Sequence, residues 1–441
     1  MRLEALRTVY FFEENINEVN IMLTNRPRGT NDFLPGETEK WQYIEERMRA
    51  ICKSFGFKEI RTPIFEHTEL FLRSVGDTSD IVEKEMYSFE DKAFRHLTLR
   101  PENTAGVVRA FIENRLYAEP QPTKLYYIGP MFRYDQPQAG RYRQFNQFGV
   151  EVMGSNDPSV DAEVITLAAE LFKSLGLNGL TVKINTVGCK DCRPEHARKL
   201  KEYFGAYKDE LCPTCQSRLE RNPLRILDCK EEKCHNIAKG APTTIESACD
   251  NCKDHFAKVK EYLDLAGIPY EVDTNLVRGL DYYTQTAFEI VVNTIGSAQN
   301  AVCGGGRYNG LLEQCGGTDM PGIGFAVGME RLLLTMKEQG ISLSLEENPS
   351  VYIASLGEKA QGAAFDLALK LRRKGIYVEK DYLNRSLKAQ MKGADRMKVK
   401  YVVMIGDDEL AKNKLVVRAM ADGSQEEVAM EEIVQYLEGR L

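Results

Sequence analysis

The feature that most restricts how this chain can fold is the clustering of its cysteines. Eight of the eleven cysteines lie between Cys189 and Cys252. A short cysteine pair across a turn presents two thiolates at the angle that a tetrahedral metal requires, and two such pairs complete a four-sulfur shell. The four short pairs are Cys189 with Cys192, Cys212 with Cys215, Cys229 with Cys234, and Cys249 with Cys252. Four pairs can combine in three ways, and the first two have the spacing of a zinc ribbon.

Three states of these thiols are compatible with the sequence. No signal for export is recognisable in residues 1–25, which argues against disulfide bonds. Structural zinc is the state that we predict, and reduced free thiols and a redox switch are the alternatives. Zinc would fold an insertion at about residues 188–262, which lacks a dense apolar pattern of its own, and would not take part in chemistry.

Two segments further along have the composition of a pocket for a small polar molecule. The first is Arg278-Gly279-Leu280-Asp281-Tyr282-Tyr283, and the second is Cys303-Gly304-Gly305-Gly306-Arg307-Tyr308-Asn309-Gly310. Arginine offers a planar set of donors, Asp accepts, Tyr combines a hydroxyl with an apolar ring, and glycine permits close approach. Taken alone, Asp-Tyr-Tyr would more often be the polar end of a core strand, and the other segments of the same kind change that balance.

A third segment is predicted to form a strand, a loop and a second strand. Residues 127–133 are β-prone, and Gln138-Ala139-Gly140 is typical of a turn. In the second strand, the two-residue period places Gln147 and Glu151 on the same face of the sheet. A buried carboxylate costs free energy unless a partner satisfies it, and a cationic ligand would satisfy Glu151. The alternative for the loop is a solvated hairpin tip.

Together with three further motifs, these segments resemble the class II histidyl-tRNA synthetases. Residues 26–35 resemble the N-terminal signature of that family, residues 62–66 the class II dimer motif, residues 132–151 the second class II motif, and residues 322–332 the third. Residues 278–283 and 303–310 resemble the histidine-recognition motifs, which separate this family from other class II synthetases. The sequence departs from the family pattern at Asn103, Asp135, Gln136 and Asn146.

The resemblance implies a two-step reaction. The carboxylate of L-histidine attacks the α-phosphorus of ATP, which Mg²⁺ accompanies, and the 3′ hydroxyl of tRNA(His) then takes the histidyl group. Arg278 is the implied catalytic residue, standing where other class II enzymes place a metal. The implied ATP-binding residues are Arg133 at the α-phosphate, Arg141 and Arg331 at the outer phosphates, and Asp135. The implied histidine-binding residues are Glu102 and Thr104 at the α-amino group, Gln147 at the bound amino acid, Glu151 and Tyr283 at the imidazole, Tyr308 closing the pocket, and Tyr282.

The resemblance also implies an α+β class II synthetase core, in which an antiparallel sheet is flanked by helices. This core carries the Cys-rich insertion and is followed by a C-terminal α/β anticodon-binding domain. The implied limits are 1–24 for an N-terminal tail, 25–345 for the catalytic domain, and 346–441 for the anticodon-binding domain.

The C-terminal part can also be interpreted without the resemblance. Between residues 351 and 405, predicted strands and helices alternate, which indicates a small parallel sheet after a linker at 341–350. Lys388, Lys392 and Arg396 share one face of a predicted helix because they are four residues apart. That face is either simply solvated or contacts the phosphates of RNA.

Net charge and hydropathy argue against two other classes of protein. The formal net charge of −7 argues against a protein that coats nucleic acid with its whole surface. No apolar run is long enough to predict a membrane span. We therefore expect a cytoplasmic protein; residues 1–21 are a tail or reflect a true start at Met22. The resemblance of residues 62–66 to the class II dimer motif, with the apolar Leu70, Phe71 and Leu72 after it, implies a homodimer. Two alternatives are a catalytically silent histidine-binding regulatory subunit and an RNA-binding scaffold with the synthetase fold.

Overall fold

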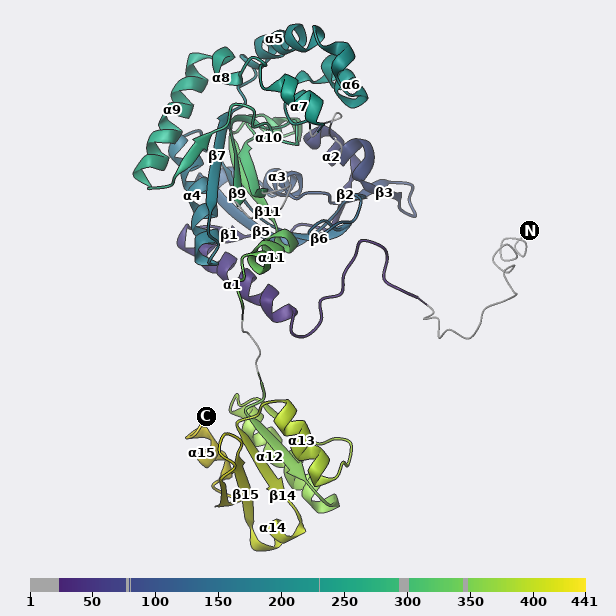
Figure 1. Cartoon of the computed structure of the whole chain (residues 1–441), viewed down its shortest axis with the longest axis vertical. Coiled ribbons are helices and arrows are strands. Elements are labelled where there is room, and N and C mark those ends of the chain that lie inside the picture. Colours follow the sequence, from purple (N-terminus) through teal and green to yellow (C-terminus); the bar gives the residue numbers. More distant parts are fainter. Residues whose placement is uncertain (1–23, 77–78, 80, 230, 293–300, 344–347) are drawn as a thin grey trace, which may run out of the picture. The chain divides into compact units, whose positions relative to one another are not determined.

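The structure is a computed structural model that describes residues 24–76, 79, 81–229, 231–292, 301–343 and 348–441. The chain divides into two compact units after Leu343, within the linker expected at 341–350. Each unit is described by itself (Figure 1). The predicted N-terminal tail lies outside the described residues except for Thr24.

The first unit is built on a large sheet, which has eight strands within the described ranges, in the order β1-β5-β6-β11-β10-β9-β7-β8. The six inner strands pair antiparallel, whereas the edge strands β1 and β8 run parallel to β5 and β7. The predicted antiparallel sheet is thus confirmed for its centre, and its edges make it mixed. The strands are β1 Lys58–Glu59, β5 Thr123–Phe132, β6 Gln144–Met153, β7 Leu180–Thr186, β8 Tyr270–Val272, β9 Thr284–Val292, β10 Ala301–Arg307 and β11 Gly322–Gly328.

Helices cover both faces of this sheet. On one face lie α1 (Thr38–Ser54), α4 (Pro158–Ser174), α9 (Asp250–Leu265) and α11 (Met329–Glu338), which share a core cluster with Tyr126 of β5. On the other face, α3 (Thr104–Glu113) and α10 (Leu311–Gln314) pack in a second cluster with Leu125 and Tyr127. Successive residues of β5 enter different clusters because strand side chains alternate between the two faces. The face with α3 also carries Gln147 and Glu151.

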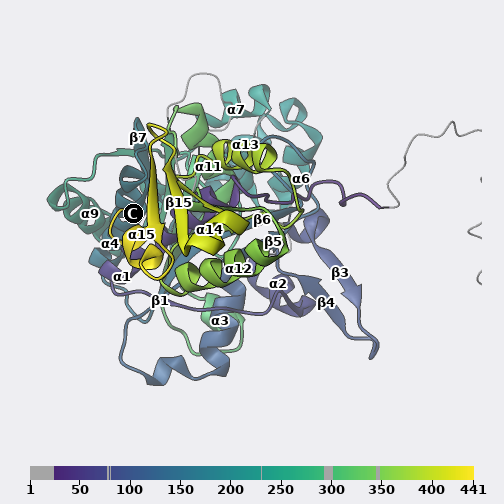
Figure 2. The ribbon, with the colours of Figure 1, turned by 90° about the horizontal axis from the view of Figure 1, so that it is seen from below.

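A small antiparallel sheet, with β4 (His96–Leu99) between β2 (Phe65–His67) and β3 (Tyr87–Glu90), stands beside helix α2 (Thr68–Val75). The β3–β4 hairpin projects from one side of the first unit in both views (Figures 1 and 2). Ile64 and Phe65 next to it are about half exposed, with 44% and 52% of their surface accessible. Phe71, which the dimer prediction counts as apolar surface, is buried within its own subunit.

The Cys-rich insertion is helical. Its helices α5 (Arg193–Gly205), α6 (Pro213–Arg221), α7 (Glu232–Ala238) and α8 (Thr244–Ser247) gather at one end of the large sheet (Figure 1). The sequence analysis was wrong about its apolar content: Leu200, Phe204, Leu219 and Ile226 are buried in a core of the insertion's own. The pattern was hard to recognise because these helices are short and each contributes only one or two core side chains.

The second unit is a five-stranded sheet in the part of it that the structure describes, in the order β13-β12-β14-β15-β16. The predicted parallel arrangement is correct for β12, β13 and β14, but β15 and β16 add an antiparallel half that the sequence analysis missed. The elements are β12 Val351–Ser355, α12 Glu358–Arg373, β13 Val378–Lys380, α13 Leu387–Arg396, β14 Tyr401–Ile405, α14 Asp407–Lys412, β15 Lys414–Ala419, β16 Gln425–Ala429 and α15 Ile433–Glu438. Lys388, Lys392 and Arg396 are exposed on α13.

Candidate active site

A cavity of about 960 Å³ opens on the Glu151 face of the large sheet. Its walls come from β6, β10, β11, the start of α3 and α11, and the loop before β9. The predicted site residues therefore come together from distant parts of the sequence. The residues lining this cavity include all twelve assigned to catalysis, ATP or histidine: Glu102, Thr104, Arg133, Asp135, Arg141, Gln147, Glu151, Arg278, Tyr282, Tyr283, Tyr308 and Arg331.

Glu151 is the buried acid of this cavity. Its carboxylate accepts hydrogen bonds from the hydroxyls of Thr104 (2.8 Å) and Tyr308 (2.7 Å). Burial raises the pKa of Glu151 to about 8, because the charged form loses its hydration. Gly324 lies opposite it on β11, and a β-carbon at that position would lie 2.0 Å from Glu151 Oε2. The carboxylate thus occupies space that only a glycine leaves open.

Around Glu151 lie further groups suited to an amino acid. Glu102 accepts the backbone N–H groups of Thr104 (2.6 Å) and Ala105 (3.0 Å) at the N-terminus of α3, and its burial raises its pKa. Gln147 is buried, and its Oε1 has no hydrogen-bond partner among the described residues. A buried acceptor without a partner is costly and points to a donor on a ligand.

Three tyrosines form an aromatic wall beside these polar groups. The ring centroids of Tyr282 and Tyr283 are 4.7 Å apart, and those of Tyr282 and Tyr308 are 5.9 Å apart. Such a wall excludes water and offers flat apolar surface to a planar side chain.

Arg278 is held against the glycine-rich strand β10. Its guanidinium forms an ion pair with Glu289 of β9 and lies 5.9 Å from the ring centroid of Tyr283. A β-carbon at Gly304 would lie 1.9 Å from Arg278 Nη2, so the glycine provides the space that the arginine fills. Glu289 was not predicted as part of the site; its signal was a single acid within the apolar strand Phe288–Val292.

The other arginines are spread along the cavity. Arg133 donates to the carbonyl of Pro101 (2.8 Å), and its guanidinium stacks 5.3 Å from the centroid of Phe145. Arg141 pairs with Asp135 at 3.1 Å, and Arg331 donates to the carbonyl of Ala301 at 3.2 Å. Guanidinium groups from separate elements therefore line one cavity, as a polyphosphate would require.

The residues that depart from the family pattern have local partners. Asn103 Oδ1 accepts from the Thr62 hydroxyl at 2.6 Å. Asn146 donates to Glu330 through its backbone and its amide, at 2.9 and 3.0 Å, and burial raises the pKa of Glu330 to about 7. Gln136 is exposed. Glu330 was not predicted as part of the site, because nothing in the sequence pairs it with Asn146.

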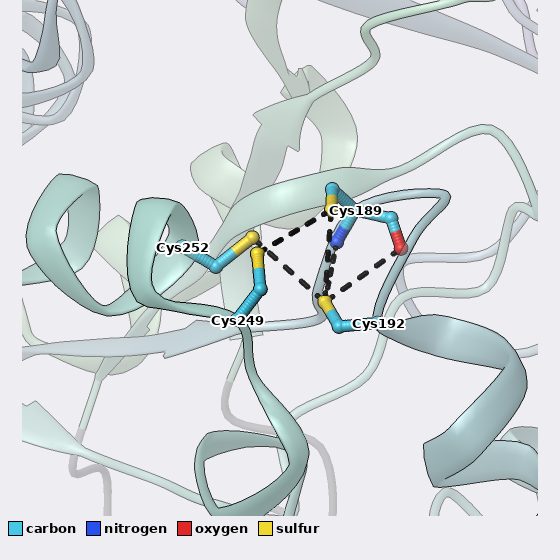
Figure 3. A group of neighbouring side chains, drawn as sticks. All are labelled: Cys189, Cys192, Cys249 and Cys252. Carbon is cyan, nitrogen blue, oxygen red and sulfur yellow. Dashed lines mark hydrogen bonds between the residues drawn. The ribbon is translucent and has the colours of Figure 1, made fainter.

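The eight clustered cysteines form two separate four-sulfur groups. The outer cluster is Cys189, Cys192, Cys249 and Cys252, whose side chains converge in Figure 3, and the inner cluster is Cys212, Cys215, Cys229 and Cys234. Within each cluster the sulfur atoms all lie within 4.8 Å of one another.

The sulfur separations fit a tetrahedral metal. With metal–sulfur bonds of about 2.3 Å, a tetrahedral zinc site has sulfur atoms about 3.8 Å apart. In the outer cluster, Cys189 Sγ lies 3.7 Å from Cys192 Sγ and 3.8 Å from Cys249 Sγ; in the inner cluster, Cys212 and Cys229 are separated by 3.9 Å. None of the eight forms a disulfide bond, and the backbone N–H groups of Cys189 and Cys212 donate to sulfur.

The zinc-ribbon spacing of the first two cysteine pairs did not indicate the correct partners. The pairs are nested: the first combines with the last, and the second combines with the third. The first pair comes directly after β7, a strand of the large sheet, and the last pair stands at the start of α9, a helix that packs on that sheet. The two inner pairs lie within the helical insertion. The packing of β7 and α9 in the first unit brings the first and last pairs together, and this contact cannot be predicted from the spacing of the cysteines.

Comparison with known proteins places these observations in a family. The family model described as "Histidyl-tRNA synthetase" matches residues 29–198 and 220–332, and the model described as "Anticodon binding domain" matches residues 350–440. The described part of the chain holds no helix with the length and hydropathy needed to cross a membrane.

Individual relatives match along nearly the whole chain. A histidine–tRNA ligase of Desulforamulus reducens is 58% identical, over 95% of this chain and all of its own length. One from Pelotomaculum thermopropionicum is 56% identical, over 95% of this chain and 99% of its own. The crystal structure of apo histidyl-tRNA synthetase from S. aureus superposes with a TM-score of 0.81 at 44% identity, covering 94% of this chain and all of that one.

Proposed function

This chain belongs to the histidyl-tRNA synthetase family, and we propose that its cavity is where histidine, ATP and the tRNA end react. The observation that carries the assignment is one continuous cavity with the buried acid Glu151 and the arginines Arg133, Arg278 and Arg331 in its walls. As a histidine–tRNA ligase, the chain joins the histidine carboxylate to the α-phosphorus of ATP and releases pyrophosphate. The 3′ hydroxyl of the tRNA then takes the histidyl group and releases AMP.

At the amino-acid end, the groups around Glu151 bind histidine. Glu102 and Thr104 bind the α-amino group, and the buried Gln147 Oε1 accepts a hydrogen bond from the bound amino acid. Glu151, whose two oxygens keep acceptor sites beyond those used by Thr104 and Tyr308, accepts an imidazole N–H. Tyr282 and Tyr283 provide the aromatic wall beside the imidazole, and Tyr308 closes the pocket. An apolar side chain of similar shape would leave the buried acid without a donor, which is how the site rejects it.

At the phosphate end, arginines carry the chemistry. Transfer to a phosphorus depends mainly on positioning and on neutralisation of charge. Arg133 contacts the α-phosphate. The outer phosphates are contacted by Arg331 and by Arg141, which Asp135 holds in place. Arg278 stabilises the charge that develops during the attack. Mg²⁺ enters with ATP and neutralises its phosphates.

The second unit is the natural contact for the rest of the tRNA. Its match to anticodon-binding domains and the exposed cations Lys388, Lys392 and Arg396 on α13 support binding to the RNA backbone. Charging of tRNA supplies protein synthesis, so we assign the chain to the cytoplasm.

Each cysteine cluster binds one zinc ion. The sulfur separations support this assignment, and the two sites would hold the short helices of the insertion together. The measurement is metal analysis of protein purified without chelators. Two zinc ions per chain are expected from the two clusters. Absence of metal, with all eight thiols reactive, would leave them as ordinary reduced cysteines.

The chain acts as a homodimer. The exposed apolar side chains Ile64, Phe65 and Leu72 beside β2 and α2, with Phe89 and Phe94 on the projecting hairpin, support an interface on this side of the first unit. Their solvent exposure would be removed in a dimer.

Pyrophosphate exchange tests the central proposal. Purified protein should exchange labelled pyrophosphate into ATP with histidine and not with any other amino acid supplied singly. Exchange that does not depend on histidine, or that another amino acid supports equally, would overturn the assignment of the cavity.

A further inference from the structure

The inner cluster lies close to the histidine-recognition segment that contains Arg278. Cys212 and Cys229 themselves line the cavity, together with Arg225. Residues 216–228 connect the second and third cysteines of the cluster, and they form the end of α6 and the 3₁₀ turn Pro223–Ile226. Four sulfur atoms bound to one metal would close this segment into a short loop at the edge of the cavity.

Two side chains of this loop contact residues 278–281. Arg225 Nη1 donates to the backbone carbonyl of Arg278 at 3.0 Å, and Asn222 Nδ2 donates to Asp281 Oδ1 at 3.1 Å. Arg225 Nε also lies 4.0 Å from Asp281 Oδ1. Residues of the insertion therefore hold both Arg278, the proposed catalytic residue, and Asp281.

The loop is held by apolar packing as well as by the cluster, since Leu219, Leu224 and Leu227 are buried in the core of the insertion. Arg225 is 6% exposed and Ile226 is fully buried, but both sit in a single turn that lies between the two cysteine pairs. The backbone carbonyl of Arg225 accepts from Arg218 at 3.2 Å, a residue that also belongs to the loop. Fixing the two ends of such a short segment restricts the positions available to its middle.

The residues that contact the histidine-recognition segment and the first two cysteines of the inner cluster differ in their match to the family model. Asn222 and Arg225 lie within the second matched stretch, residues 220–332, whereas Cys212 and Cys215 lie in the unmatched residues 199–219. The contacts to Arg278 and Asp281 thus come from within the matched stretch, and two of the four ligands of the inner cluster lie outside it.

We propose that the zinc ion of the inner cluster is a positioning device for histidine recognition: through Asn222 and Arg225 it holds residues 278–281 in the shape that binds and activates histidine. This inference rests on the proposed function and adds to it. Asn222 and Arg225 are positioning residues, because they act on residues 278–281, which place the adjoining Tyr282 and Tyr283 beside the imidazole, and not on the substrate.

Loss of the inner zinc should affect the binding of histidine much more than the binding of ATP. Arg133 donates to Pro101, Arg141 pairs with Asp135 and Arg331 donates to Ala301, and these partners all lie outside the loop. ATP binding should therefore depend much less on the inner metal than histidine binding does. Loss of the inner zinc should raise the KM for histidine and lower kcat, while the KM for ATP changes much less. A merely structural defect would lower the active fraction and would leave both KM values unchanged.

The first experiment compares the full-length protein with its Cys212→Ser/Cys215→Ser variant in pyrophosphate exchange and metal analysis. The variant should keep the zinc of the outer cluster and lose that of the inner one. The KM for histidine should rise about tenfold or more, the effect of losing a hydrogen bond to a charged group. Cys52→Ala, which removes a cysteine outside both clusters from the core on the other face of the large sheet, is the control and should change neither quantity.

The second experiment separates the metal from the contacts. Asn222→Ala/Arg225→Ala keeps all eight cysteines and should keep both zinc ions, yet it should show the same rise in the KM for histidine. In that background, the cysteine substitutions should add less than about twofold, because coupled positions are not additive. Arg198→Ala, an exposed arginine of α5 whose side chain is 62% accessible, is the matched control.

The outcomes distinguish the inference from the proposed function. A variant that lacks the inner zinc but keeps the wild-type KM for histidine overturns the inference. The inference is also overturned if the cysteine substitutions and Asn222→Ala/Arg225→Ala raise this KM independently, so that the two increases multiply when all four substitutions are combined. If the cysteine variant is recovered unfolded, the Asn222→Ala/Arg225→Ala variant decides alone, and an unchanged KM for histidine in it overturns the inference. Failure of the wild-type protein to exchange with histidine overturns the proposed function instead. Absence of zinc from active wild-type protein overturns the inference and leaves the catalytic assignment standing.

Discussion

Individual side chains of the cavity depend on neighbours for both their position and their charge. Glu151 is held by two hydroxyls, Glu102 by two backbone amides, and Arg278 by Glu289. The sequence period predicted that Glu151 and Gln147 share a face, because alternation along a strand is a local property. It did not reveal Glu289 or Arg225 as partners of the Arg278 segment, because those contacts join β9 and the insertion to residues that are close only after folding.

The raised pKa of Glu151 predicts a pH-dependent cost in stability. The folded acid titrates near pH 8, whereas a glutamate in an unfolded chain titrates near pH 4.5. Between these values the folded state holds one more proton, so the wild-type chain loses stability as pH rises through this window. Glu151→Gln lacks this loss. Its free energy of unfolding relative to wild type should therefore increase with pH, by at most about 1.4 kcal/mol per unit, and level off above about pH 8.

Urea unfolding of both proteins at several pH values across this window measures the difference. Glu330, whose pKa is raised to about 7, contributes equally to both proteins and cancels. A difference that is constant with pH, or that falls as pH rises, would contradict the buried, protonated state of Glu151.

Arg278 should matter for the reaction more than for binding. Its contact strengthens as charge develops on the phosphorus, so Arg278→Ala should lower kcat in pyrophosphate exchange on the order of 10²-fold and change the KM for histidine much less. Steady-state exchange measures both constants, with the exposed Arg198→Ala as control. Exchange at the wild-type rate would remove Arg278 from the catalytic role.

At the scale of elements, a buried ion cluster joins three pieces of the first unit. Arg307 of β10 and Asp161 of α4 are both fully buried, and Arg307 Nε lies 2.8 Å from Asp161 Oδ2. His255 Nε2 of α9 lies 3.2 Å from the other oxygen of Asp161. The strand that carries the glycines of the site is therefore fastened to two helices on the far face of the sheet.

Removal of Asp161 should destabilise the first unit strongly. Asp161→Ala leaves the Arg307 guanidinium buried without its counter-charge, and breaking a buried pair in this way costs about 3–5 kcal/mol. Glu170→Ala on the same helix removes an exposed partner of Lys173, 3.8 Å away, and should cost less than about 1 kcal/mol. Denaturant unfolding compares the two, and equal losses would show that the buried pair contributes no more than a surface one.

Elements were predictable where their pattern is local. The strand, loop and strand predicted around residues 127–151 are β5 and β6 with their connection, and the alternation predicted between residues 351 and 405 is β12 to β14 with their helices. Strand β16 was missed because four of its five residues are not buried and so leave no alternating pattern. The nesting of the cysteine pairs was equally unpredictable, because the anchoring of β7 and α9 to the large sheet selects the partners.

At the scale of the whole molecule, the exposed apolar side of the first unit predicts assembly. Light scattering at micromolar concentration should give twice the mass of one chain. Phe65→Asp, which places a charge in the proposed interface, should shift the protein towards the monomer. Phe365→Asp is a matched control, since both phenylalanines are 52% accessible and Phe365 lies in the second unit. A wild-type monomer with full activity would contradict the dimer.

The close approach of Gly324 to Glu151 has a consequence for how the amino-acid preference can change over time. A side chain at position 324 collides with the carboxylate, and a shorter residue at 151 leaves a hole across from the glycine. A β-carbon at position 324 would also lie 2.3 Å from the backbone oxygen of Val150, so this position accepts only glycine whatever residue stands at 151. Descendants or designed variants that accept another amino acid must therefore keep Gly324 and change Glu151 or the other walls of the pocket, so the backbones of two facing strands limit how the preference for histidine can evolve.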